Sequence, residues 1–411
     1  MPGGEPKKTS DKKAGPVAGM VRDMRIFLIA GEHSGDALGG KLMRALSNAL
    51  EGRVSFHGVG GQAMERQGLK SLFSLDDIAV MGPLSILKRF PTIAKRVYQT
   101  IDAAVAEKPD SVVIIDSPEF THPIAKRIRK RAPQIPIIDY VSPSIWAWRS
   151  GRARKMKPYV DHVLALLPFE PDAHEKYGGP RCTYVGHPLT ERQEWMRALD
   201  PGGMIERMGL SQDDVILAML PGSRTSEVKR LMKPFGETLA LLQGRGHDIK
   251  IIMPVIKTLR PLIEHFAKDW PQQPLFLESE DDKFRAFKAS KAALAASGTV
   301  TLELALSGTP MVVAYKVDPL AARLRFLLNV HSVVLANLVL GENVFPECLQ
   351  ERCTPDIMAD AVEDLLSETP ARKAQLEALK KIPQVMAHEG LSPSDHAAQI
   401  IKRYALKTPV R

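Results

Sequence analysis

The chain has 411 residues, of which 44% are hydrophobic and 25% charged, and its formal net charge is +9. This composition is that of a soluble globular protein, and the length predicts two or three domains. Cys182, Cys348 and Cys353 form no CxxC pair and no zinc-ligand spacing, so the sequence supports neither a disulfide framework nor a zinc site and indicates a reducing compartment. The basic charge suits nucleic acid, anionic lipid or phosphorylated substrates without choosing among them.

Residues 1–24 contain Gly, Pro, Lys and Asp with almost no apolar side chains, which predicts a disordered basic tail. The tail lacks an apolar h-region, so we expect no signal peptide. No stretch of the sequence approaches the roughly 18–20 apolar residues that a membrane-spanning helix needs. We therefore expect any membrane contact to be peripheral.

The first predicted strand covers residues 25–30, and a glycine-rich loop, residues 31–36, leads from it into a helical pattern that ends at Leu50. Strand, glycine-rich loop and helix in this order are typical of a doubly wound fold, although the loop is not GxGxxG and predicts no dinucleotide site. Glu32, Ser34 and Asp36 would lie at the carboxyl end of this strand and could line a substrate cleft. The alternative is a tight turn that needs glycine for its geometry.

A second strand and glycine loop are predicted at residues 54–61, and a helical stripe follows them. Pro91 lies within the stripe and predicts two short helices rather than one. An apolar stripe with basic flanks can lie in a membrane interface or accept acyl chains, but a surface helix packed on the core is the commoner alternative. The apolar residues of the stripe are Ile86, Leu87, Phe90, Ile93 and Val97.

Residues 111–116 form a β-branched apolar run that ends in Asp116. In an open α/β sheet a catalytic carboxylate is expected outside the carboxyl end of a strand. Asp116 could therefore act as a general base that takes a proton from an attacking hydroxyl. The alternative is an aspartate that caps the next helix.

Another strand, residues 135–141, leads into a segment that holds Trp146 and Trp148, and Arg149 opens a basic stretch after them. Aromatic residues interleaved with basic ones can serve nucleic acid, a phosphosugar or a lipid headgroup. Residues 163–170 and 184–189 each predict one more short strand, which closes the first domain.

The second half repeats the opening of the first, after a linker of helical character at residues 190–212. A strand at 215–220 is followed by a loop containing Gly222, Ser223 and Arg224 and then by a helix that ends near Leu242. Arg224 could hold a phosphate in a fork geometry. The alternative is a cap or a local ion pair with Glu227. Further strands are predicted at 250–255 and 274–278.

The stretch Ser297-Gly298-Thr299 follows an alanine-rich strand at 292–296, and Glu303 comes one helical turn later. Free N–H groups at a helix start attract anions, and glycine lets a phosphate approach the backbone. This loop could hold the diphosphate of a nucleotide sugar while Glu303 accepts hydrogen bonds from the ribose. An ordinary helix cap is the alternative. Further along, Asn337 stands beside an apolar run, and residues 355–369 and 371–407 are helical by pattern, the last stretch being long enough to cross back to the first domain.

The two halves together resemble the layout of the GT-B glycosyltransferases, and the motifs resemble those of the lipid-A-disaccharide synthase family. The motifs occur in the family's order, and the most specific of them is the Ser-Pro-Ser-Ile-Trp-Ala-Trp segment. The matching segments are residues 31–36, 116–120, 140–149, 167–170, 185–188, 220–224 and 297–299.

The resemblance implies two Rossmann-like doubly wound domains that face a cleft, with C-terminal helices crossing back to the first domain. The first domain (25–190) would take the acceptor and the membrane, the second (205–370) the UDP-sugar, and residues 371–411 would pack back on the first. The implied reaction joins UDP-2,3-diacylglucosamine to 2,3-diacylglucosamine 1-phosphate (lipid X), forms a β-1,6-linked disaccharide with inversion and releases UDP. No metal and no other cofactor are implied.

The resemblance also implies roles for individual residues. Asp116 would be the base, Arg224 would stabilise the departing UDP, and Glu32 matches a further cleft position. The implied UDP-binding residues are Gly222, Ser223, Arg224, Ser297, Gly298, Thr299 and Glu303. The candidate acceptor or cleft residues are Ser34, Asp36, Trp146, Arg149 and Asn337.

Two other functions remain open from the sequence. A UDP-GlcNAc 2-epimerase or the peptidoglycan transferase of similar fold would share the nucleotide loop, but would not share the tryptophan segment. A nucleic-acid-binding protein would use the basic surface, but gives no reason for two strand–loop–helix halves. For the synthase we expect an anionic membrane surface as partner, no nucleic acid, a homodimer through C-terminal exchange, and a cytoplasmic location on the inner membrane.

Overall fold

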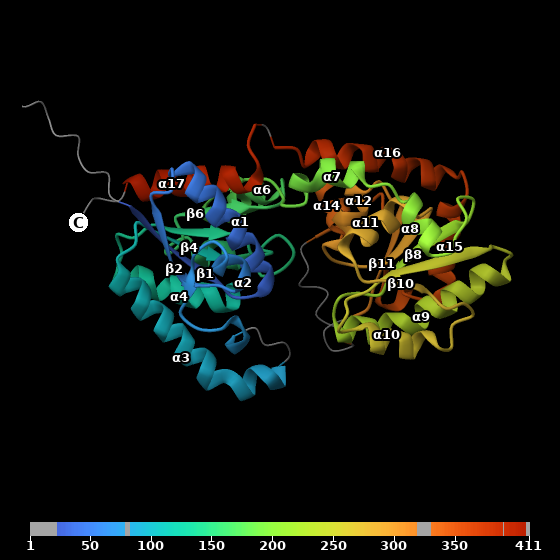
Figure 1. The fold of residues 1–411 in the computed structure, drawn as a ribbon, viewed down its shortest axis with the longest axis horizontal. Helices are drawn as coiled ribbons and strands as arrows, with labels where there is room; N and C mark the ends of the chain where they lie inside the picture. The colour runs from blue at the N-terminus through green and yellow to red at the C-terminus, as the bar shows by residue number, and fades with distance from the viewer. Residues whose placement is uncertain (1–22, 79–82, 319–329, 389, 408–411) are drawn as a thin grey trace, which may run out of the picture.

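The computed structural model describes residues 23–78, 83–318, 330–388 and 390–407, and leaves the side chains of 83–88 out of that description. Figure 1 shows two α/β halves side by side, joined by short helices, with the last helix lying over the first half. The predicted tail falls almost wholly outside the described residues.

The first half contains a seven-stranded parallel sheet in the order β3-β2-β1-β4-β5-β6-β7. Its elements are β1 (Met24–Ala30), α1 (His33–Ala49), β2 (Val54–Val59), α2 (Gln62–Glu65), β3 (Lys70–Ser71), η1 (Leu75–Asp77), α3 (Pro83–Glu107), β4 (Ser111–Ile115), α4 (Pro118–Arg131), β5 (Ile137–Tyr140), α5 (Gly151–Met156), β6 (His162–Ala165), α6 (Glu170–Lys176) and β7 (Arg181–Tyr184). The strand order reverses between β1 and β4, which is the topological switch point where open α/β sheets bind ligands.

The second half contains a six-stranded parallel sheet in the order β10-β9-β8-β11-β12-β13, with its switch point between β8 and β11. The linking elements are η2 (Thr190–Arg192), α7 (Gln193–Ala198) and α8 (Gly202–Arg207). The second half then runs β8 (Val215–Leu220), α9 (Thr225–Gly244), β9 (Ile249–Pro254), α10 (Arg260–Ala267), β10 (Leu275–Leu277), α11 (Glu280–Ala289), β11 (Ala292–Ala296), α12 (Val300–Leu306), β12 (Met311–Tyr315), α14 (Leu335–Leu340), β13 (Glu347–Leu349), η4 (Gln350–Arg352), α15 (Pro355–Leu366) and α16 (Pro370–Val385). The last described helix is α17 (Pro393–Lys407).

Both sheets are covered by helices on both faces, which explains why their strands are almost continuously apolar. Along β1, Ile26 and Leu28 face the core beneath α1 and α17, whereas Phe27 and Ile29 face the core beneath α3 and α4. The predicted doubly wound α/β fold is therefore confirmed.

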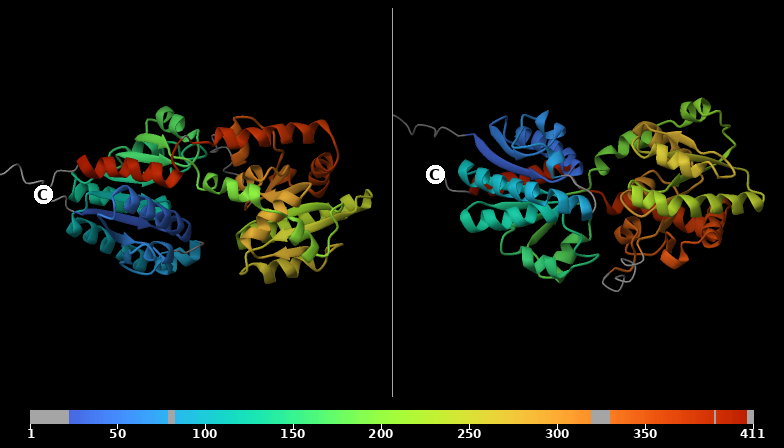
Figure 2. Two further views of the ribbon diagram at one scale, coloured as in Figure 1. Left: turned by 45° about the horizontal axis from the view of Figure 1, so that its top comes forward. Right: turned by 90° about the horizontal axis from the view of Figure 1, so that it is seen from below.

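The C-terminal helix α17 returns to the first half, but the prediction that all of residues 371–411 pack there is wrong for α16, because its Leu379 and Ile382 are buried in a core with α12 of the second half. Ala397 and Ile401 of α17 are buried in the same core as Leu42 of α1, and the Lys402 ammonium donates a 2.6 Å hydrogen bond to the Ala49 carbonyl. Figure 2 shows α17 against the first half in both further views.

The prediction of two short helices around Pro91 is wrong, because α3 runs unbroken through that residue. Pro91 lacks an N–H and leaves one helical carbonyl without its partner. Phe90, Pro91 and Thr92 are all exposed, so the proline ring lies on the solvent side of the helix and does not have to fit into the core. In the described residues, no helix combines the length and the apolar content that crossing a bilayer requires.

A second correction concerns the strand predicted at residues 184–189. The paired strand β7 covers Arg181–Tyr184 instead and lies beside β6. Gly186 has a φ of +97°, a left-handed conformation that ends the extended chain immediately after Val185.

Candidate active site

The switch point of the first sheet brings Asp116 and Ser34 together. Asp116 follows β4 and Ser34 lies in the first turn of α1, and the Ser34 hydroxyl donates a 3.2 Å hydrogen bond to the Asp116 carboxylate. The same carboxylate accepts a 2.7 Å hydrogen bond from the Ser117 backbone N–H. One carboxylate oxygen of Asp116 is thus held by the loop, and the side chain is only partly buried.

The backbone at Asp116 is strained. Asp116 and Ser117 have φ angles of +54° and +45°, a left-handed conformation that is uncommon for residues other than glycine. The strain is held by hydrogen bonds, since Asp116 N–H donates to the Tyr140 carbonyl at 3.0 Å and its carbonyl accepts from the Thr121 hydroxyl at 2.9 Å. Strain of this kind concentrates at functional sites, where it fixes the direction of a side chain.

Gly31 allows the loop after β1 to pack directly on the loop after β4. A Cβ atom at residue 31 would lie 2.5 Å from the Ser117 Cβ, so a larger residue would separate the two loops. Glu32, the residue immediately before α1, is exposed and its side chain caps no helical N–H. It is therefore free to meet a ligand at this edge of the sheet.

The prediction that Asp36 lines the substrate cleft is not supported, because Asp36 is a buried residue that caps a helix. Only 6% of its surface is exposed, and its carboxylate accepts hydrogen bonds of 2.7, 2.9 and 3.0 Å from the backbone N–H groups of Gly61, Ala63 and Met64. These are the free N–H groups at the start of α2. All of these partners belong to the protein itself.

Replacing Asp36 with alanine is expected to lower the free energy of unfolding by about 3 kcal/mol, because three N–H groups, one buried and two half-buried, lose their acceptor. The folded fraction should keep a near wild-type kcat. Thermal denaturation and active-enzyme titration measure the two effects separately. A variant that keeps its stability but loses turnover would show that Asp36 takes part in catalysis.

The tryptophan segment is anchored by a buried glutamate. The Trp146 indole N–H donates to the Glu170 carboxylate at 3.1 Å, and its ring packs edge-on against Phe169 with centroids 5.3 Å apart. Glu170 also accepts hydrogen bonds from the backbone N–H groups of Leu166 and Leu167, and its burial raises the pKa of its carboxyl to about 7. Trp146 is thus held in place by the loop after β6.

Trp148 and Arg149 remain at the surface beyond this anchor. Trp148 is 43% exposed, and the Arg149 guanidinium lies 4.1 Å from the centroid of its ring. Arg152 and Arg149 both approach the Glu119 carboxylate, at 2.7 and 3.7 Å. An exposed aromatic ring with a guanidinium group stacked on it suits a phosphorylated ligand.

The second switch point carries a cavity of about 640 Å³. It lies at the carboxyl ends of β8, β9, β10 and β11, and all seven predicted UDP-binding residues line it. Those residues are Gly222, Ser223, Arg224, Ser297, Gly298, Thr299 and Glu303.

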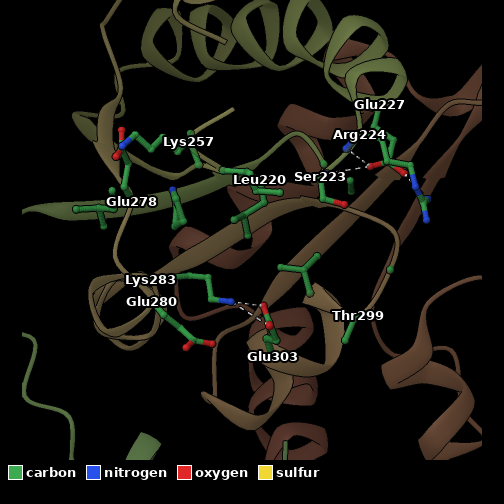
Figure 3. Close-up of a pocket in the computed structure, with 18 of the residues that line it drawn as sticks. Leu220, Ser223, Arg224, Glu227, Lys257, Glu278, Glu280, Lys283, Thr299 and Glu303 are labelled. Atoms are coloured by element: carbon green, nitrogen blue, oxygen red, sulfur yellow. Dashed lines mark hydrogen bonds and ion pairs between the residues drawn. The ribbon is translucent and has the colours of Figure 1, made fainter. Parts of the chain in front are cut away.

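Arg224 stands at the edge of this cavity at the start of α9 (Figure 3). Its guanidinium pairs with Glu227 at 3.1 Å, and Glu227 caps the helix by accepting hydrogen bonds from the N–H groups of Ser223 and Arg224. The cap and ion pair considered from the sequence are thus present. The Arg224 side chain is nevertheless 61% exposed, so it remains available to an anion.

The loop after β11 faces the same cavity. Gly298 has a φ of +148°, and a Cβ atom there would meet no other atom within 4 Å, so the backbone is open to a close approach. Ser297 donates its hydroxyl to the Val333 carbonyl at 2.8 Å, which ties the loop to the next segment of the chain. The helix start predicted near Thr299 is confirmed, since α12 begins at Val300.

The prediction that Asn337 lines the cleft is not supported either. Asn337 is fully buried and does not line the cavity. Its amide oxygen accepts from the N–H groups of Val344 and Phe345 at 3.0 and 2.9 Å, and its amide nitrogen donates to the Phe345 carbonyl at 2.9 Å. Asn337 therefore organises the loop before β13.

Four charged residues of the cavity were missed by the sequence analysis. Lys257 and Glu278 follow β9 and β10, so the rule that ligands bind beyond the carboxyl ends of strands could have found them. Glu280 and Lys283 belong to the first turn of α11, and nothing in the local sequence marks them. Among the residues that the structure describes, no group of three or more His, Cys, Asp and Glu side chains is arranged to hold a metal ion.

The predicted apolar stripe of α3 is only partly exposed. Phe90 is 63% exposed, whereas Ile93 is half-buried and Val97 packs against the core of the first half. Val97 therefore does not belong to an exposed stripe. Ile86 and Leu87 belong to α3, but their side chains lie outside the described residues.

Several solved structures share this fold at low sequence identity. The S. aureus MnaA–UDP co-structure has a TM-score of 0.60 and 14% identity, and the match covers 94% of this chain and 98% of that one. The UDP-GlcNAc 2-epimerase from Neisseria meningitidis bound to UDP-GlcNAc has a TM-score of 0.59 and 13% identity, with 93% and 100% coverage. MurG from Acinetobacter baumannii has a TM-score of 0.53 and 14% identity, with 92% and 99% coverage. At this identity the likeness shows the fold alone.

Similarity in sequence is much higher to one group of enzymes. The family model described as lipid-A-disaccharide synthetase matches residues 26–401. The lipid-A-disaccharide synthase of Nitrobacter winogradskyi is 50% identical over 378 residues, which are 92% of this chain and 94% of that protein. The lipid-A-disaccharide synthase of Rhodopseudomonas palustris is 48% identical over 391 residues, which are 95% and 98% of the two chains. The epimerase alternative has no comparable support, and the chain belongs to the lipid-A-disaccharide synthase family.

Proposed function

We propose that this chain is an inverting glycosyltransferase that joins UDP-2,3-diacylglucosamine to lipid X through a β-1,6 linkage and releases UDP. The observation that carries the proposal is the cavity of the second half, where Arg224, the open turn at Gly298 and the Glu303 carboxylate line one space. Its volume of about 640 Å³ falls within the range of small-molecule sites. Family membership supports the choice of substrates.

The cavity would hold the UDP part of the donor. Two structures of the same fold are complexes with UDP and with UDP-GlcNAc, which supports a nucleotide at this switch point. The diphosphate would lie against the backbone of Ser297–Thr299 and meet the Arg224 guanidinium. The Glu303 carboxylate would accept hydrogen bonds from the ribose hydroxyls.

Asp116 would supply the base. It would take the proton from the 6-hydroxyl of the acceptor while that oxygen attacks the anomeric carbon, and the bond to UDP would break on the opposite face. Ser34 would orient the carboxylate through its hydrogen bond. Arg224 would stabilise the negative charge that grows on the departing diphosphate. Glu32 would be a second polar group at the acceptor edge.

The acceptor phosphate would meet the surface that carries Trp148 and Arg149. The aromatic ring and guanidinium are stacked on each other there, and Trp146 is fixed behind them by Glu170. We also propose that the enzyme works at the cytoplasmic face of the inner membrane as a peripheral protein, and that a homodimer forms by exchange of the C-terminal helix α17.

The membrane proposal predicts that Phe90→Asp lowers binding to vesicles of anionic phospholipid by about tenfold or more, because an exposed ring of α3 would no longer enter the interface. Leu406→Asp is the matched control. Leu406 is 60% exposed at the end of α17, which covers the opposite face of the sheet (Figure 1). Sedimentation with vesicles measures both variants. Equal vesicle binding by wild type and Phe90→Asp would show that the exposed face of α3 does not contact the membrane.

The reaction itself is tested by UDP release. The full chain, folded in detergent, is given UDP-2,3-diacylglucosamine and lipid X, and the disaccharide product is identified by mass spectrometry. UDP-GlcNAc with no acceptor is the control for epimerisation. Disaccharide formation supports the proposal, whereas epimerised UDP-GlcNAc without any disaccharide would contradict it.

A further inference from the structure

Lys283 makes a symmetric ion pair with Glu303 inside the cavity. Its ammonium nitrogen lies 3.0 and 3.1 Å from the two carboxylate oxygens of Glu303. The side chains are only 24% and 17% exposed, and both line the cavity (Figure 3). The same ammonium lies 4.7 Å from the centroid of the buried Phe284 ring, which limits its movement.

The geometry of this pair leaves part of the carboxylate free. An ionised carboxylate has about four lone-pair sites, two on each oxygen. Lys283 occupies one site on each oxygen, so each oxygen can still accept one more hydrogen bond. Two neighbouring hydroxyl groups, as on a ribose, match that remaining capacity.

The ion pair also reduces the repulsion that a negatively charged diphosphate would meet in the cavity. A diphosphate would have to enter a space lined by four carboxylates, and like charges repel strongly in a partly buried site. Each of the four has a cationic partner. The pairs are Glu227 with Arg224 at 3.1 Å, Glu278 with Arg260 at 2.7 Å, Glu280 with Arg192 at 2.6 Å and Glu303 with Lys283 at 3.0 Å.

We propose that Lys283 is a positioning residue for ribose recognition, an inference that rests on the nucleotide assignment of the cavity. Lys283 fixes the orientation of the Glu303 carboxylate and balances its charge. Glu303 then accepts hydrogen bonds from both ribose hydroxyls while the diphosphate lies in the same cavity. Without Lys283, the carboxylate repels the diphosphate and turns away from the ribose.

The test is a binding cycle with two ligands, UDP and 2′,3′-dideoxy-UDP, which lacks both ribose hydroxyls. Calorimetry on the full chain should show that wild type binds the dideoxy ligand about 100-fold more weakly, because two hydrogen bonds to a charged group are lost. In Lys283→Met this ratio should fall to about threefold or less, and in Lys283→Arg it should be largely restored. A purely structural defect would weaken both ligands equally and leave the ratio unchanged.

Lys257→Met is the matched control, since it removes a cation that lines the same cavity beside Glu278, away from Glu303 (Figure 3). It should weaken both ligands and keep the wild-type ratio. Glu303→Gln, which conserves side-chain shape, should lower the ratio as Lys283→Met does, so the inference stays testable if one variant folds poorly. An unchanged ratio in Lys283→Met, or an equal fall in Lys257→Met, overturns the inference alone. Wild type that binds no UDP overturns it together with the proposed function.

Discussion

Replacing Asp116 with asparagine is expected to lower kcat for disaccharide formation by about 10³-fold, the middle of the range for loss of a general base. Asparagine is the right substitution because it tolerates the left-handed backbone at this position, where φ is +54°. Its amide oxygen can still accept the hydrogen bond from the Ser117 N–H. The proton-accepting capacity is then the main property removed.

UDP affinity provides the control for Asp116→Asn. Asp116 lies at the switch point of the first sheet and the nucleotide cavity at that of the second, so UDP should bind with wild-type affinity. Ser34→Ala, which removes only the hydrogen bond that orients the carboxylate, should cost about tenfold in kcat. Near wild-type turnover by Asp116→Asn would move the base elsewhere, with Glu32 as the next candidate.

Replacing Arg224 with methionine is expected to lower kcat by about 10²- to 10³-fold, the cost of removing one group that stabilises charge in the transition state. Affinity for the intact donor, UDP-2,3-diacylglucosamine, should fall by less, about tenfold, because the extra charge on the diphosphate grows only as the glycosidic bond breaks. The fold should survive, since Glu227 still caps α9 through the backbone N–H groups of residues 223 and 224.

Lys233→Met is the matched control for Arg224→Met. Lys233 is on the helix that Arg224 precedes, its side chain is 79% exposed, and its ammonium lies 3.8 Å from the Glu237 carboxylate. Steady-state UDP release and equilibrium binding of the donor without acceptor, measured on both variants, separate kcat from donor affinity. If Arg224→Met kept a near wild-type kcat while its donor affinity fell, Arg224 would hold the donor without helping UDP leave.

The strands and the loops beyond them were predictable because they depend on local sequence. A strand buried on both faces needs an unbroken apolar run, and β4 and β11 coincide with such runs. The loops after them carry the glycine and polar residues that a switch point requires. This local pattern is enough to place Asp116 and the loop at Ser297–Thr299 at the carboxyl ends of their strands.

Two predictions were wrong, the helix break at Pro91 and the strand at residues 184–189. In both, a preference read from the local sequence was outweighed by the structure around the backbone. Proline disfavours a helix interior, but Pro91 is exposed to water, which reduces the penalty. Residues 184–189 are apolar enough for a strand, but the left-handed Gly186 ends the extended chain before they can pair. In both places the outcome depends on what surrounds the backbone.

The sequence by itself determined the family, the two α/β halves and seven of the residues that line the nucleotide cavity, because these follow from motifs and apolar periodicity. Only the tertiary structure decided which polar side chains are already used by the protein. Asp36 and Asn337 are buried and their hydrogen bonds go to the protein itself, whereas Asp116 and Arg224 are partly exposed and keep part of their capacity for a ligand. It also brought Lys283 to Glu303 across 20 residues of sequence. The physical reason is that a side chain's partners are set by how distant segments pack, which residue type and local spacing do not encode.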